Sequence, residues 1–153
     1  MATLKTDVQT AQTTGFAKDR VEGQKVTGDI RYTEAVYTTT GAEAAGDVIE
    51  VVTLPIGAIV LPEKSSIACE ASGGTGTAIS KLGDAGDDDR YSATSVALTS
   101  AANTAVTPAL ATSVTVRTPM TSTTNVLKAT VALTSGSVTA GKKVVFLVAF
   151  RMP

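Results

Sequence analysis

The sequence predicts an all-β protein, a jelly-roll or related β-sandwich of about eight antiparallel strands with an extended N-terminal arm. The 153 residues include 26 Thr and 18 Val, and these β-branched side chains suit a pleated strand better than a helix. Short apolar or alternating segments recur with turn signals about every 8–12 residues, which is typical of sandwiches. No amphipathic helical pattern of about 10–15 residues alternates with them, which disfavours a parallel α/β fold.

The first 46 residues are predicted to form the arm, because they are polar and lack a sustained apolar period. Residues 16–25 are dense in charge and too poor in apolar side chains to offset the entropy lost on ordering. A tail that stays disordered and a segment that orders on a partner's surface both fit this pattern. One strand is predicted near the end of the arm, at residues 30–38. The candidate contact residues of the arm are Phe16 and Val21 as apolar anchors and Arg20 and Lys25 as charge contacts.

Residues 47–153 are predicted to form the sandwich. Gly-rich residues 72–76 predict a hairpin loop between the flanking strands. The stretch 92–118 is nearly uncharged, and its strands cannot be delimited. The last strand is apolar on both faces, which predicts a place in the middle of a sandwich or against another subunit. Further strands are predicted at residues 47–54, 58–61, 65–71, 77–83, 126–133 and 143–150.

The composition excludes most kinds of catalytic and metal-binding site. Without His there is no imidazole base and no His-ligated metal, and the single Cys69 rules out a disulfide within the chain. We therefore predict no catalytic, cofactor-binding or metal-binding residue, and a buried, apolar environment for Cys69. Aromatic residues make up 4 % of the chain, too few for sugar or nucleic-acid stacking platforms. The longest apolar run, 144–150, is far shorter than a membrane-spanning helix.

Four Asp residues within Asp84–Asp89 form the sharpest local feature. Such a cluster offers oxygen ligands for Ca²⁺, but its spacing does not match an EF-hand loop. A turn in which Arg90 pairs with a neighbouring Asp is the simpler interpretation. A third possibility is a contact between subunits, because all fourteen acidic residues lie at or before Asp89 and the five charged residues after Tyr91 are basic.

Three segments resemble the head decoration, or cement, proteins of tailed bacteriophages. They are GDVIEVVTLPIGA at 46–58, KLGDAGDDDRY at 81–91 and TAGKKVVFLV at 139–148. Many members of this family are jelly-roll sandwiches without catalytic residues. The resemblance implies a protein on the outside of an icosahedral shell that bridges neighbouring capsid subunits and forms dimers or trimers. It covers roughly residues 46–150 and leaves the arm uncovered.

The expected function is therefore that of a virion structural protein on the capsid exterior, made in the host cytoplasm. Its expected partners are the major capsid protein and further copies of itself, with no nucleic acid and no membrane. The arm at residues 1–46 is the expected clamp, because an extended segment can add a strand to a neighbour's sheet. A head-fibre, spike or tail module that binds a receptor or glycan is the alternative. A carboxylate-based enzyme or a Ca²⁺-dependent binding domain is the third hypothesis.

Overall fold

The part of the chain that the structure describes contains nine strands and one short 3-10 helix. The structure is a computed structural model, and it describes residues 3–5, 30–70, 78–91, 104–106, 118–133 and 138–152. None of the described residues forms a helix long and apolar enough to cross a membrane. In chain order the elements are β1 (Thr3–Lys5), β2 (Ile30–Thr38), β3 (Val48–Thr53), β4 (Ile59–Val60), η1 (Pro62–Lys64), β5 (Ser66–Cys69), β6 (Ala78–Gly83), β7 (Thr104–Val106), β8 (Val126–Leu133) and β9 (Lys143–Arg151).

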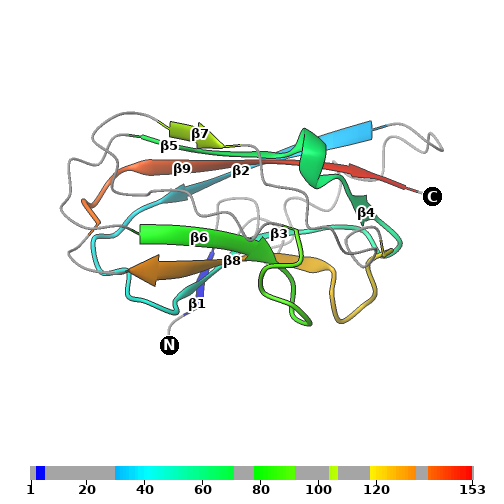
Figure 1. Ribbon diagram of the computed structural model, residues 1–153, viewed down its shortest axis with the longest axis horizontal. Coiled ribbons are helices and arrows are strands. Elements are labelled where there is room, and N and C mark those ends of the chain that lie inside the picture. Colours follow the sequence, from blue (N-terminus) through cyan, green and yellow to red (C-terminus); the bar gives the residue numbers. More distant parts are fainter. Residues whose placement is uncertain are drawn as a thin grey trace.

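The strands form two sheets that pack face to face (Figure 1). The first, called the β8 sheet below, has the order β1-β3-β8-β6. The second, the β9 sheet, has the order β2-β9-β5-β7, and β4 also pairs with β9. All pairings are antiparallel except that of β1 with β3. The predicted β-sandwich is thus confirmed.

Alternation along each strand places one set of side chains in the core between the sheets. In β9, Val144, Phe146 and Val148 are each at most 2 % exposed, and the intervening side chains point to the outer face. In β3 the register shifts between Glu50 and Val52, and this bulge allows two consecutive valines, Val51 and Val52, to be buried. Burial of each such side chain stabilises the fold by roughly 1.5–3 kcal/mol.

The strands predicted from alternation are all present, within one or two residues of their expected ends. The final strand is the most connected element, because it pairs with β2, β5 and β4. One of its two apolar faces packs in the core, whereas Val145 and Leu147 on the other face are partly exposed. The sequence pattern does not predict β1 or β7, because three residues are too few to show a period.

The hairpin predicted at residues 72–76 is wrong, because the strands that flank this loop do not pair with each other. The strands on either side of it belong to different sheets: β5 pairs with β9 and β7, whereas β6 pairs with β8. Glycines predict a change of chain direction, but they do not determine whether the next strand pairs with the last one or crosses to the other sheet. The loop residues themselves lie outside the described part of the chain.

The strand predicted inside the arm is confirmed at β2 and belongs to the sandwich. It pairs with β9 over all nine of its residues, and its Ala35 and Tyr37 are part of the hydrophobic core. Residues 6–29, with the candidate contacts Phe16 and Arg20 among them, lie outside the described residues. The predicted clamp therefore stays a prediction that rests on the sequence.

Candidate functional site

The acidic segment forms a tight loop directly after β6. The amide of Asp84 donates to the carbonyl of Asp87 (2.9 Å), and the amide of Tyr91 donates to the carbonyl of Leu82 (3.0 Å). The returning chain passes so close to Gly83 that a Cβ there would lie 2.2 Å from the carbonyl oxygen of Asp87. Only glycine fits this close approach, so the loop is built into the backbone around Gly83.

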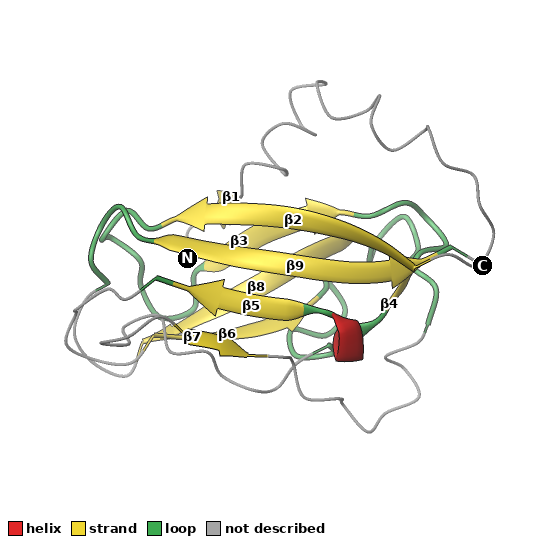
Figure 2. Cartoon of the chain, turned by 90° about the horizontal axis from the view of Figure 1, so that it is seen from above, coloured by secondary structure: helices red, strands yellow, loops and turns green. Residues whose placement is uncertain are grey.

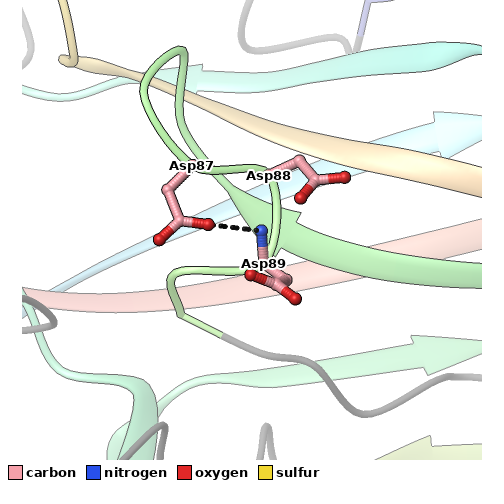
Figure 3. Close-up of side chains that lie close together, drawn as sticks. All are labelled: Asp87, Asp88 and Asp89. Atoms are coloured by element: carbon pink, nitrogen blue, oxygen red, sulfur yellow. Dashed lines mark hydrogen bonds between the residues drawn. The ribbon is translucent and has the colours of Figure 1, made fainter. Parts of the chain in front are cut away.

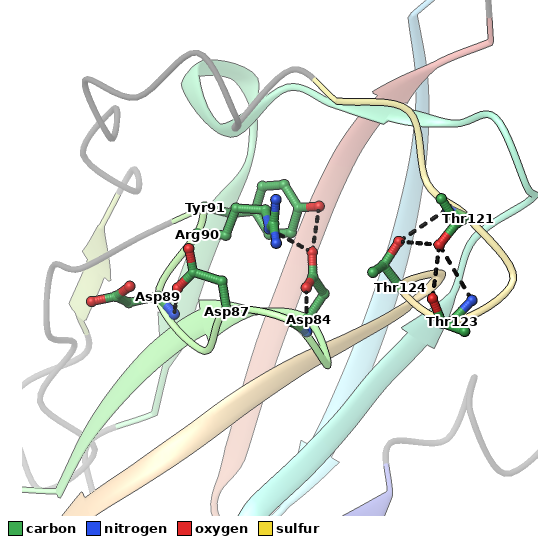
Figure 4. A network of polar contacts seen from close by, with 9 residues as sticks. Asp84, Asp87, Asp89, Arg90, Tyr91, Thr121, Thr123 and Thr124 are labelled. Atoms are coloured by element: carbon green, nitrogen blue, oxygen red, sulfur yellow. Dashed lines mark hydrogen bonds and ion pairs between the residues drawn. The ribbon is translucent and has the colours of Figure 1, made fainter.

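Asp84 is the buried centre of this loop (Figure 4). Its side chain is 1 % exposed and pairs with Arg90, whose Nε lies 2.8 Å from Oδ2. The hydroxyl of Tyr91 donates to the same oxygen (3.1 Å), and the amide of Gly86 donates to Oδ1 (2.8 Å). A buried carboxylate needs such partners to offset its desolvation. The predicted pairing of Arg90 with an Asp of the loop is thus confirmed.

Tyr91 is buried with its hydroxyl beside Asp84. Burial raises the pKa of Tyr91 far above its usual value, and the charge of Asp84 raises it further. The phenol therefore stays protonated and acts as a hydrogen-bond donor. Next to this centre, the hydroxyls of Thr121, Thr123 and Thr124 hydrogen-bond among themselves (Figure 4). These three hydroxyls bond to one another and accept from the backbone amides of Thr121 and Thr123.

The other three aspartates of the loop face outward (Figure 3). Asp87, Asp88 and Asp89 each offer a carboxylate oxygen within 4.8 Å of the others, the one such group among the residues that the structure describes. The ammonium of Lys81 lies 3.8 Å from both Asp88 and Asp89. A side-chain hydrogen bond with Asp87 raises the pKa of Asp89, and Lys81 opposes this effect. A lysine thus already supplies positive charge to this exposed cluster.

A second buried carboxylate, Glu43, lies in the connection between β2 and β3. Its Oε1 accepts from the Tyr37 hydroxyl (2.7 Å) and from the amide of Thr40 (2.6 Å), and its Oε2 accepts from the amide of Gly41 (3.0 Å). Burial alone raises the pKa of Glu43, but the hydrogen bonds from Thr40 and Tyr37 outweigh burial and hold the pKa below its usual value. Gly41 adopts a φ of 82°, which favours glycine.

Both carboxylates serve the fold. Each of them holds a connection in place by accepting from a buried tyrosine and from at least one backbone amide. Cys69 is buried on β5, as the sequence predicted. Three large apolar side chains of the described residues remain exposed and were not predicted from the sequence. Ile30, Tyr32 and Ile56 are 45 %, 55 % and 62 % exposed, and the alternation of β2 was the signal that placed two of them on one face.

The fold is one that occurs in chains of bacteriophage capsids. A chain of the cyanophage Pam1 capsid asymmetric unit superposes with a TM-score of 0.52 and 22 % identity, covering 86 % of this chain and 90 % of that one. A chain of the capsid of Ralstonia phage GP4 superposes with a TM-score of 0.57 and 20 % identity, covering 85 % and 88 %. No family model and no curated protein sequence matches the chain.

Proposed function

We propose that the chain is a decoration, or cement, protein that binds the outside of an icosahedral phage capsid and bridges neighbouring major capsid protein subunits. The observation that carries the proposal is the extent of the structural likeness. It spans 85–86 % of this chain and 88–90 % of two chains from phage capsids. Such near-complete coverage matches a whole small structural chain rather than a domain grafted onto a larger enzyme.

The chemistry of the described residues supports a structural, non-catalytic role in which the protein holds the subunits of a shell together. The buried carboxylates of the described residues, Glu43, Asp47 and Asp84, have structural partners, and the sequence contains no His to act as a base near neutral pH. A protein that holds a shell together needs a rigid body and many repeated contacts, since weak contacts repeated around a lattice add up through multivalency. The sandwich supplies the rigid body.

The arm is the proposed clamp on the capsid. Its sequence joins charged residues such as Arg20 and Lys25 to isolated apolar anchors such as Phe16 and Val21. A segment of this composition gains enough contact to order when it lies on another protein. An extended segment can also pair with the edge of a neighbour's sheet through main-chain hydrogen bonds.

Truncation tests the clamp, provided that it spares β2. We expect a chain lacking residues 1–29 to fold, because it gives up only the three-residue edge strand β1 with the partly buried Leu4, and to lose binding to capsid shells purified without it. A chain lacking residues 1–46 is the matched comparison and should fail to fold, because it loses Ala35 and Tyr37 from the core. Folding is read from the cooperative thermal transition, and binding from co-sedimentation with shells. Unchanged shell binding after the shorter truncation would contradict the clamp.

Copy number separates decoration from the alternative. A decoration protein is present at hundreds of copies per particle, whereas a head-fibre, spike or tail module is present at a dozen or fewer. Quantitative analysis of purified particles, together with imaging of the labelled protein on the shell, provides both number and position. A low copy number at a single vertex or on the tail would overturn the decoration role and favour the receptor-binding alternative.

A further inference from the structure

The strand β1 is held on the sandwich by few contacts. It has three residues, lies at the end of the β8 sheet and pairs with β3 alone. Its ladder is the one parallel pairing among the described strands, and parallel pairing is slightly weaker per residue than antiparallel pairing. Its Leu4 packs against the core but is only partly buried. By comparison, β2 pairs with β9 over nine residues. Detachment of β1 is therefore a low-energy opening of the structure.

The sandwich does not depend on β1 for its core. On its other side β3 pairs with β8 from Val48 to Thr53, and Ile49, Val51 and Val52 of β3 belong to the hydrophobic core. Detachment of β1 therefore opens one edge of β3 and leaves the rest of the β8 sheet paired. An open sheet edge invites pairing with another chain. In the docked position, β1 covers that edge.

Docking of β1 also ties down the segment that the sequence predicts as the clamp. Figure 2 shows β1 and β2 along the same side of the sandwich, each at the end of its own sheet. Residues 6–29 connect these two strands, so both ends of the connection are fixed while β1 is docked. The main-chain groups of β1 that pair with β3 are then not available to another protein. The docked state thus restrains the segment that a clamp by strand addition would use.

We propose that β1 is an exchangeable strand. In the free protein it covers the edge of its own β3, and on the shell it detaches and pairs with an exposed sheet edge of a capsid protein subunit. The exchange replaces one set of main-chain hydrogen bonds by another, so the new pairing offsets the cost of detachment. Before the protein meets a shell, the docked strand protects β3 from pairing with other chains. The inference rests on the proposed function for the identity of the partner.

Hydrogen exchange of the full chain, measured by NMR without capsid, tests whether β1 opens. We expect the amides of Leu4 and Lys5 to exchange about a hundredfold or more faster than those in the middle of β8, because detachment of an edge strand does not require global unfolding. Protection of the β1 amides as strong as that of the β8 amides would overturn the proposal, since β1 would then open only when the whole sandwich unfolds.

A disulfide that locks β1 on β3 tests whether detachment is needed for shell binding. Thr3 and Val48 are register partners, so the double variant Thr3→Cys and Val48→Cys places two thiols opposite each other. Cys69 is buried and does not compete for them. We expect the oxidised variant to bind purified shells about tenfold or more weaker than the same variant after reduction, because the locked strand cannot pair with the capsid.

The matched control is a lock in the same sheet that leaves β1 untouched. Lys81 and Thr130 are register partners on β6 and β8, and the double variant Lys81→Cys and Thr130→Cys should bind shells equally in both redox states. Mass spectrometry confirms each bridge, and thermal unfolding confirms that each variant is folded.

The possible outcomes separate this inference from the proposed function. Equal shell binding by the oxidised and reduced β1 variant would overturn the exchange and leave the decoration role intact. An equal loss on oxidation in the control would also overturn it, because a cross-link anywhere in the sheet would then suffice. Failure of the native chain to bind shells at all would overturn the decoration role, and this inference with it.

Discussion

Tyr91 donates a hydrogen bond to Asp84 beside the end of β6, and Tyr37 donates one to Glu43 between β2 and β3. Both carboxylates are nearly fully buried, yet their charges are compensated in different ways. Asp84 has a cation at 2.8 Å in Arg90. The hydrogen bonds found for Glu43 come from the Tyr37 hydroxyl and from the backbone and hydroxyl groups of the turn that it closes, Thr40 and Gly41.

This difference shows two ways to keep a carboxylate inside a sandwich. In an ion pair one partner compensates most of the buried charge. Removal of that partner therefore leaves the other charge buried and uncompensated. Converging backbone amides spread the compensation over several donors, each of which gains from binding a charged acceptor. The first centre should therefore fail abruptly when one residue is changed, and the second should fail gradually and with a marked dependence on pH.

The largest effect is expected at the ion pair. Asp84→Asn leaves the mostly buried Arg90 without its counter-charge, and we expect a loss of about 3 kcal/mol in the free energy of unfolding. Asp88→Asn is the matched control in the same loop. Its side chain is 61 % exposed, so a change within about 0.5 kcal/mol is expected. Urea unfolding at neutral pH measures both. Equal losses in the two variants would show that the Asp84–Arg90 pair contributes no more to the free energy of unfolding than the exposed Asp88 does.

A smaller effect is expected at the amide-bound centre. Glu43→Gln removes the charge that the amides of Thr40 and Gly41 bind, at a cost of about 1–2 kcal/mol at neutral pH. The pKa of Glu43 is lower in the folded chain than its usual 4.5. Its ionised form therefore stabilises the fold above about that pH, and this contribution is lost as the pH falls through the folded-state value.

Unfolding of the native and Glu43→Gln chains should consequently be compared at neutral pH and in acid. We expect the difference between them to shrink as the pH falls below the range in which Glu43 ionises. A difference that stays constant with pH would mean that shape, rather than charge, is responsible.

The smallest effects are expected from the two tyrosine hydroxyls. Tyr91→Phe and Tyr37→Phe each remove one hydrogen bond and keep the buried ring, and each should cost about 1 kcal/mol. The two variants differ in a second readout. The Tyr37 hydroxyl lowers the pKa of Glu43, so Tyr37→Phe should raise that pKa in an NMR titration. An unchanged titration of Glu43 would show that the backbone amides alone compensate its charge.

Local patterns predicted most of the strands but not their partners. Alternation in 126–133 and 143–150 located β8 and β9 because the period of a half-buried strand is local. It did not reveal that β5 and β6 lie in different sheets, since pairing depends on contacts between distant segments. The sequence predicted that Arg90 pairs with a nearby Asp of its loop, but not that the partner is the buried Asp84. The Tyr37–Glu43 contact was not predicted, because it depends on the turn that Gly41 allows.

The central position of β9 has a consequence for how the chain reaches its fold. Thr39, just after β2, bonds to Lys142, just before β9, across 103 positions, and β9 also pairs with β4 and β5. The β9 sheet can therefore be completed only after residue 151 has been synthesised, and until then β2 and β5 lack the central strand with which both of them pair. Topologies dominated by such distant pairings fold slowly and expose unpaired strands meanwhile. Aggregation during synthesis is thus the hazard that this architecture carries.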